Sequence, residues 1–169
     1  TPKGYWKISG FHFSICHPTT TGFTPIPKLI NNNDFIPFLD YVAPEYVIES
    51  IVSNESDVFS FAMMYAQLLV AHYTNNTNSL LGTHQSRETY ITRMNSLSSI
   101  LDQKLAFLQN ETLAAGTIIE SIRRATVKNH KERVTSQFIL NNCELMFGEE
   151  VKALRFLSNM SMREPVKKA

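Results

Sequence analysis

The sequence predicts a mainly α-helical fold, and two observations lead to this prediction. From Ser56 onward, apolar residues recur every three or four positions, which is the spacing of amphipathic helices. Six of the seven prolines lie before that point, where they interrupt any long helix. With 169 residues, of which 43% are hydrophobic, the chain can bury the core of one domain or of a large part of one.

The first part of the chain, residues 1 to about 55, is rich in Pro, Thr, Asn and aromatic residues. The stretches Tyr5–Ile8 and Phe11–Ile15 combine β-branched and aromatic residues, which predicts two short strands. No regular period holds between Cys16 and Tyr41, and a loop of that length is typically functional or disordered. We therefore expect a long irregular segment before the helices begin.

The next segment predicts a long buried helix over about residues 57–71. Ser56 and Asp57 form a favourable N-cap at its start. One face carries apolar residues at helical spacing, namely Val58, Phe61, Ala62, Tyr65, Leu68 and Leu69. Most of the remaining surface is apolar too, with Phe59, Met63, Met64 and Val70. A helix that is apolar nearly all round is a buried one, so we expect this helix at the centre of the fold.

Four further helices are expected after a polar loop over residues 74–86. The first, Arg87–Leu108, has an ordinary amphipathic face. The others are expected at Asn110–Thr126, Thr135–Met146 and Glu149–Met160, with a break at Gly148.

Composition and motifs exclude several classes of function. The 16 Lys+Arg and 15 Asp+Glu leave no basic surplus, which argues against nucleic acid as the main partner. The longest apolar stretch, Phe59–Tyr73, is too short for a transmembrane segment. Cys16 and Cys143 provide no disulfide framework, and the five histidines lack the spacing of metal ligands, so we expect no metal site. No nucleophile elbow, Walker loop or dinucleotide-binding motif is present.

Four short motifs in a fixed order stand out from this background. The tripeptide Ala43, Pro44 and Glu45 matches the APE signature that ends a protein-kinase activation segment. It follows Lys7–His12, which stands where kinases carry the strand and metal-binding turn K-I-x-D-F-G. The separation of the two motifs is a plausible activation-segment length.

The other two motifs come later in the chain. Ser56–Phe61 resembles the SDVWSLG start of the central kinase helix, and Lys131–Thr135 resembles the (Q/E)RPT element near the kinase C-terminus. Over residues 1–147, the sequence therefore resembles the C-terminal lobe of a protein-kinase-like fold. The resemblance implies an activation segment over about 10–45 and the central helix over about 57–71.

The same resemblance implies that the chain is a fragment of a longer protein. The first lobe and the catalytic loop would lie upstream of Thr1. Residues 148–169 would be the lead-in to a helical HEAT-type repeat region.

Structural roles are expected for Ala43, Pro44, Glu45, Asp57 and Arg133. Glu45 and Arg133 should form a buried ion pair that ties the activation segment to the C-terminal helices. Asp57 could accept backbone N–H bonds from the catalytic loop, as the resemblance implies, or it could simply cap its helix. Both roles remain open.

The metal-binding turn departs from the kinase pattern. In a working kinase its Asp holds the Mg²⁺ that bridges the ATP phosphates, but Gly10 stands at that position. His12 stands where the kinase motif D-F-G has its Gly. No Asp or Glu occurs from Thr1 to Asn33. Loss of the metal ligand removes the main electrostatic stabilisation of phosphoryl transfer. We therefore expect a pseudokinase without catalytic residues, in which ATP remains a candidate cofactor and Mg²⁺ is not expected.

A closer resemblance is carried by Trp6–Phe13, which is similar to the WKI-x-GFDF strand of the Scy-like family of pseudokinases, especially its coated-vesicle-associated branch. Met146–Gly148 and Ala153–Leu157 resemble that family's passage out of the kinase-like domain. His12 departs from the pattern, which has Asp there. The resemblance implies a cytoplasmic scaffold, peripheral to Golgi and endosomal membranes and coated vesicles, that works with clathrin and adaptor complexes through contacts mostly outside this chain.

Two other hypotheses remain. The chain could belong to a divergent Ser/Thr protein kinase with weak ATP binding and phosphotransfer, which an intact ATP-site Lys and catalytic Asp upstream would favour. It could also be a helical interaction module whose kinase-like motifs are accidental. That hypothesis predicts that Arg133→Ala leaves folding unchanged.

Overall fold

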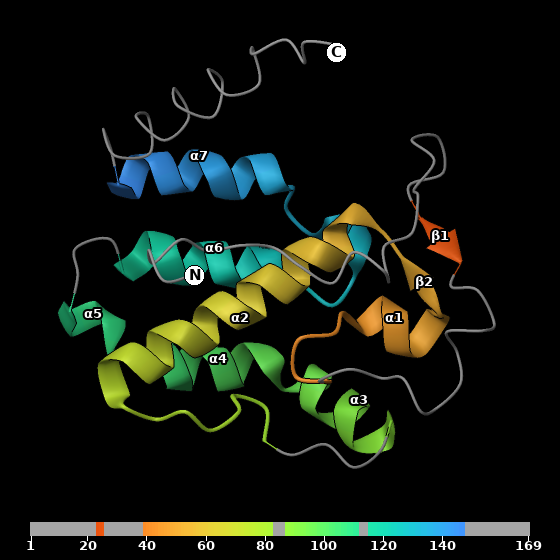
Figure 1. The fold of residues 1–169 in the computed structure, drawn as a ribbon, viewed down its shortest axis with the longest axis horizontal. Coiled ribbons are helices and arrows are strands. Elements are labelled where there is room, and N and C mark those ends of the chain that lie inside the picture. Colours follow the sequence, from red (N-terminus) through yellow and green to blue (C-terminus); the bar gives the residue numbers. More distant parts are fainter. Residues whose placement is uncertain (1–22, 26–38, 83–86, 112–114, 148–169) are drawn as a thin grey trace, which may run out of the picture.

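The computed structural model describes residues 23–25, 39–82, 87–111 and 115–147, and this part of the chain is mainly helical, as predicted (Figure 1). The helices are α1 (Pro44–Glu49), α2 (Asn54–Thr74), α3 (Arg87–Asn95), α4 (Leu97–Leu105), α5 (Leu108–Glu111), α6 (Ala115–Ala125) and α7 (Ser136–Phe147). A 3-10 turn, η3 (His130–Glu132), lies between α6 and α7. The short strands β1 (Thr24–Pro25) and β2 (Ile51–Val52) pair antiparallel, with Thr24 opposite Val52.

Several predicted features lie outside the described residues. They are the strands at 5–8 and 11–15, the helix at 149–160, the break at Gly148 and the lead-in over 148–169.

The helix α2 runs through the middle of the fold, where it contacts α4, α6 and η3 (Figure 1). Its start differs from the predicted N-cap at Ser56 and Asp57, because Ser53 caps the helix. The backbone N–H of Ser53 donates to Ser56 Oγ at 3.0 Å, and the Ser53 side chain accepts from the Ser56 backbone. This reciprocal capping box satisfies donors that a helix start would otherwise leave unpaired.

Within the described residues, α2 is buried along one side, whereas its apolar residues lie nearly all round it. Its buried residues lie along one side and are Ser56, Val58, Phe59, Ala62, Met63, Ala66 and Val70. Phe61, Met64 and Leu68, by contrast, are 46%, 43% and 43% exposed. Both sides of the helix carry apolar residues at helical spacing, so hydrophobicity alone could not select the side that packs on the core.

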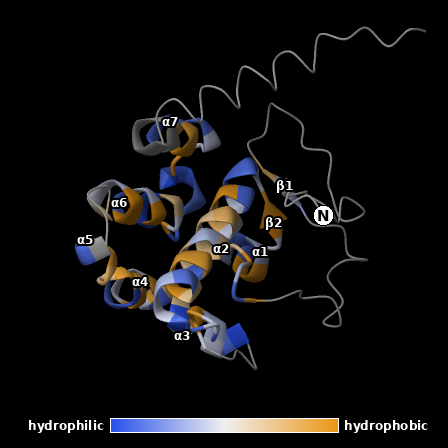
Figure 2. Cartoon of the chain, turned by 60° about the vertical axis from the view of Figure 1, so that its left-hand side comes forward, coloured by the Kyte–Doolittle hydropathy of each residue, from blue (hydrophilic) through white to orange (hydrophobic). Residues whose placement is uncertain are grey.

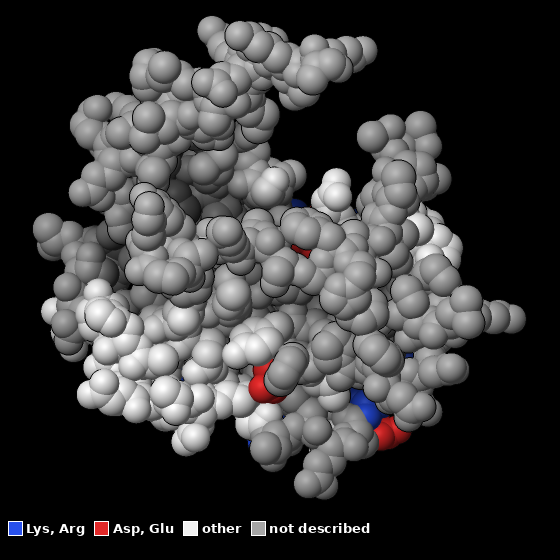
Figure 3. Space-filling model, in the orientation of Figure 1, with Lys and Arg blue, Asp and Glu red and all other residues white. Residues whose placement is uncertain are grey.

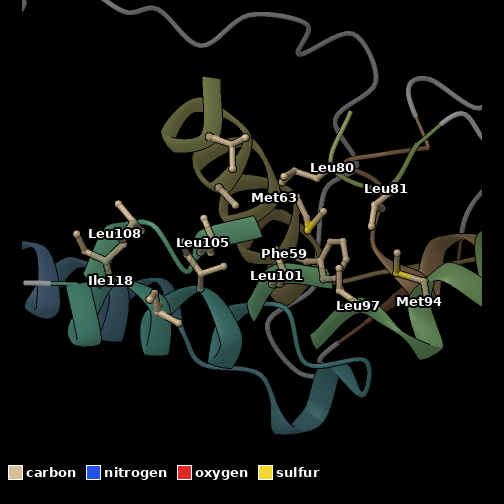
Figure 4. Packing of buried hydrophobic residues seen from close by; sticks show 14 of the residues in the cluster. Phe59, Met63, Leu80, Leu81, Met94, Leu97, Leu101, Leu105, Leu108 and Ile118 are labelled. Atoms are coloured by element: carbon tan, nitrogen blue, oxygen red, sulfur yellow. The ribbon is translucent and has the colours of Figure 1, made fainter. Parts of the chain in front are cut away.

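The main core packs the buried side of α2 against α3–α6 and the loop that follows α2 (Figure 4). Phe59 and Met63 of α2 meet residues of that loop and of α3 to α6, among them Leu80, Leu81, Met94, Leu97, Leu101, Leu105, Leu108 and Ile118. The helix α6 contributes an amphipathic face, and Figure 2 shows hydrophobic and hydrophilic residues in turn around it. None of the described helices combines the length and apolarity that crossing a bilayer requires.

The predicted helix Arg87–Leu108 is divided in the structure. It breaks at Ser96 into α3 and α4 and ends at Leu105. The backbone of Ser96 has φ −103° and ψ 4°, close enough to helical values that the apolar stripe stays in phase through the break. Periodicity therefore cannot detect the break.

Of the two helices that follow, the first begins later than predicted and the second matches its predicted range. Asn110, the predicted start of the first, lies in α5 instead, and α6 begins only at Ala115. The second, predicted over Thr135–Met146, is confirmed as α7 within one residue at each end.

Candidate functional site

The APE-like tripeptide forms the start of the short helix α1. Ala43 precedes the helix with an extended backbone and is 2% exposed. Pro44 occupies the first helical turn, where a missing N–H leaves no hydrogen bond unmade and the fixed φ favours the helix. This arrangement directs the Glu45 side chain inward, and Glu45 is 1% exposed.

Glu45 and Arg133, which lie 88 residues apart in the sequence, meet in this buried site. Arg133 Nη1 donates to Glu45 Oε1 at 2.8 Å, and Arg133 Nη2 donates to Oε2 at 3.0 Å. The exposed fractions of the two side chains are 0% for Arg133 and 1% for Glu45. Two parallel hydrogen bonds between a guanidinium and a carboxylate form the strongest ordinary type of ion pair.

The remaining donors of Arg133 reach backbone carbonyls from two other segments. Nη1 donates to the Glu55 carbonyl at 2.7 Å, and both Nε and Nη2 donate to the Val127 carbonyl at 3.0 Å. The guanidinium also lies over the Phe59 ring, 5.0 Å from its centroid. One side chain therefore joins α1, the start of α2 and the segment that follows α6.

Ser56 completes the site, a role that was not predicted from the sequence. Its Oγ donates to Glu45 Oε1 at 2.6 Å while it also accepts the Ser53 N–H of the capping box. The spacing of Ser53 and Ser56 resembles a capping box and could have located the true N-cap. No sequence signal links Ser56 to Glu45.

Tyr90 is the second residue of the site whose role the sequence did not predict. Its side chain is fully buried, and its Oη donates to the Val42 carbonyl at 2.7 Å. Burial raises the pKa of the phenol, and the negative charge of Glu45 raises it further. A second contact, from Arg87 Nη2 to the Ile48 carbonyl at 3.0 Å, attaches α3 to the end of α1.

Burial by itself raises the pKa of the Glu45 carboxyl. The hydrogen bonds from Arg133 and Ser56, together with the positive charge of Arg133, outweigh burial, and the net pKa lies below the ordinary value of 4.5. Glu45 is therefore ionised at neutral pH, as a bidentate ion pair requires.

Stability is expected to fall in acid because of this pKa. A carboxyl whose pKa is lower in the folded state than in the unfolded state stabilises the fold when it is ionised. This stabilisation is fully present above the unfolded-state pKa of 4.5 and is lost as the pH falls through the lower folded-state pKa. Urea unfolding of wild type and Glu45→Gln, measured in steps from pH 7 to pH 2.5, should show a larger acid-induced loss of stability in wild type than in the variant. Parallel pH profiles for the two proteins would contradict the assignment.

Asp57 lies in the first turn of α2, and its side chain is exposed. The capping alternative for this residue is wrong, because Ser53 is the N-cap. Partial desolvation by neighbouring atoms raises the pKa of its carboxyl. Within the described residues, no hydrogen-bond donor reaches that carboxyl, and its contact with a catalytic loop stays a prediction.

The metal-turn residues Gly10, Phe11 and His12 lie outside the described residues. Over 23–25, 39–82, 87–111 and 115–147, no group of three His, Cys, Asp or Glu side chains could hold a metal ion. The side chains of Glu45, Ser56 and Arg133 are buried and hydrogen-bonded to one another. What this arrangement does is hold three chain segments in one relative position.

Comparison with curated proteins finds the protein kinase domain-containing protein ppk32 of Schizosaccharomyces pombe, 27% identical over 172 residues. The match covers 98% of this chain and 21% of that protein, so the chain spans about a fifth of the relative's length. No protein-family model matches the chain, and no solved structure matches it significantly. The similarity supports a protein-kinase-like domain.

Proposed function

We propose that the chain is the C-terminal part of a pseudokinase of the Scy-like type. One observation carries the proposal, which is that Gly10 stands where a kinase needs the carboxylate that binds Mg²⁺. The domain would then act as a scaffold in clathrin- and adaptor-linked vesicle traffic between Golgi and endosomes. It would lie in the cytoplasm, peripheral to these membranes and to coated vesicles.

The geometry at Glu45 supports a scaffold role. In this site, the segment around α1 is attached by a buried ion pair, by Ser56 and by the phenol of Tyr90. Buried polar contacts of this kind hold one arrangement of the chain and disfavour others. A fold can therefore retain the architecture of the kinase lobe, and present its surfaces to partners, after the catalytic groups are gone.

Thermal unfolding of the full-length protein with ATP, with and without Mg²⁺, tests the proposal. A ligand at about a hundred times its Kd stabilises the folded state by roughly 2.7 kcal/mol, which a melting curve resolves easily. We expect no Mg²⁺-dependent shift in melting temperature. The variant Gly10→Asp, which places a carboxylate at this position, is compared with wild type for any shift that depends on Mg²⁺.

The outcomes separate the hypotheses. No shift under either condition supports a scaffold that binds no nucleotide, and a shift with ATP that Mg²⁺ leaves unchanged supports a nucleotide-stabilised pseudokinase. A shift that requires Mg²⁺ in the wild-type protein would overturn the argument from Gly10. The divergent Ser/Thr kinase would then be the better explanation, and a phosphotransfer assay would follow.

A further inference from the structure

A basic pocket opens on the side of the fold where α3 and α4 meet the end of α6. Its volume is about 330 Å³, and its lining includes Met94, Ser98, Arg123, Arg124, Val127 and Lys128. These residues come from two stretches of the chain, 94–98 and 123–128. The pocket borders the Glu45 site, because the carbonyls of Val127 and Lys128, two of its lining residues, accept hydrogen bonds from Arg133.

The three cations of this pocket are each held in place by a different neighbour. Arg123 pairs with Asp102 Oδ1 at 2.7 Å, and Lys128 Nζ donates to Asn95 Oδ1 at 2.8 Å. The Arg124 guanidinium lies 4.2 Å from the centroid of the Phe138 ring. Fixed cations lose little further side-chain entropy when a ligand binds, which favours binding.

The pocket has more positive charge than its surroundings neutralise. No Asp or Glu is among the lining residues, and within the described residues Asp102 is the one carboxylate in an ion pair with any of the three cations. Two of the three cations, Arg124 and Lys128, therefore have no carboxylate partner within the described residues. Arg123 and Arg124 also complement the carboxyl end of α6, but Lys128 lies beyond that helix, so the helix end does not account for its position.

We propose that this pocket binds the phosphomonoester of a phosphothreonine side chain in a partner peptide. A phosphomonoester carries nearly two negative charges at neutral pH and matches the two unneutralised cations. Arginine forks bind its oxygens in pairs, and Lys128 supplies a point charge. Met94 and Val127 give the pocket an apolar wall, which suits the methyl group of threonine beside the phosphate.

A membrane surface fits these observations less well. Recognition of anionic lipid headgroups relies on clusters of about four to eight basic residues spread over one surface. Here the lining of a single hollow contains three cationic residues. On the one face drawn in Figure 3, few Lys or Arg are seen among the described residues. The net charge of the chain is only +1.

The test is fluorescence polarisation on the full-length protein. The probe is a fluorescein-labelled peptide pool with one central phosphothreonine and degenerate flanks, and the same pool with threonine is the reference. The phosphorylated pool should bind at least tenfold more tightly. Lys128→Gln and Arg124→Gln should each weaken binding by about ten- to a hundredfold, as expected for lost charge-assisted hydrogen bonds.

Two further variants separate a local effect from loss of folding. Lys104→Gln removes the same charge from an exposed position on α4 outside the pocket, and binding should not change. Ser98→Glu leaves all three cations and their neighbours in place but adds a carboxylate to the lining, and binding should be lost. Melting temperatures of all variants show whether each one folds.

Three results would overturn the proposal. One is a preference for the phosphorylated pool that survives in folded Lys128→Gln and Ser98→Glu. Another is displacement of the labelled peptides by inorganic phosphate at the same concentration at which capped phosphothreonine displaces them, which would show a site for free phosphate. The third is binding to phosphatidylcholine vesicles containing phosphoinositide without binding to the peptide pool, which would show a lipid site.

Discussion

Replacement of Arg133 with Ala is expected to lower the free energy of unfolding by about 3–5 kcal/mol, because the substitution leaves the Glu45 carboxylate buried without its partner. The exposed fractions of the two side chains are 0% and 1%, so water cannot solvate the stranded charge. The carbonyls of Glu55 and Val127 lose their donors in the same step. Urea unfolding of the full-length protein, followed by circular dichroism, measures the change.

The exposed ion pair between Arg123 and Asp102 provides the matched control. Its two side chains are 45% and 43% exposed, so Arg123→Ala should lower the free energy of unfolding by about 1 kcal/mol or less. The double variant Glu45→Gln/Arg133→Met should lose less stability than the sum of its single variants, since it removes both charges. An Arg133→Ala effect no larger than that of Arg123→Ala would favour the hypothesis of accidental kinase-like motifs.

Replacement of Phe59 with Ala is expected to destabilise the fold by a similar amount, about 3–5 kcal/mol. Phe59 is 0% exposed, lies in the main core and supports the Arg133 guanidinium with its ring. The substitution creates a cavity beneath the ion pair as well as removing buried apolar surface. Chemical unfolding monitored at two wavelengths, one for helix and one for aromatic packing, measures the change and tests two-state behaviour.

Phe61 is the control for Phe59, because it lies two residues later on the other side of α2 and is 46% exposed. Phe61→Ala should cost less than about 1 kcal/mol in the described fold. Equal losses for the two variants would show that a further part of the protein covers the Phe61 side of the helix. The comparison therefore identifies experimentally which face of α2 carries the core.

These two positions also show what sequence could and could not predict. The existence of α2 follows from its apolar content, and the structure confirms a helix there. Its buried side does not follow, because Phe59 and Phe61 are equally hydrophobic and both belong to a helical stripe. Burial depends on what the neighbouring segments bring to each side, and periodicity within one helix does not contain that information.

The candidate site divides in the same way. The expectation that Glu45 meets Arg133 came from the order of the kinase-like motifs, and no local pattern would have paired residues so far apart. The roles of Ser56 and Tyr90 could not be predicted, because their contacts depend on backbone geometry. Ser56 depends on a helix capped at Ser53, and Tyr90 depends on the Val42 carbonyl, which accepts its hydrogen bond. Hydrogen bonds from side chains to distant parts of the chain produce no periodic pattern in a sequence.

The distance in sequence between Glu45 and Arg133 has a consequence during synthesis. Glu45 leaves the ribosome 88 residues before its partner, which at 5–20 residues per second is an interval of about 4 to 18 seconds. Through that interval the carboxylate keeps its water, and the start of α2 has its capping box but not the guanidinium that joins it to α1. A nascent chain halted before Arg133 can therefore attach α1 through Ser56, Arg87 and Tyr90, but the buried ion pair that joins α1 to the segment after α6 forms only once that segment has emerged.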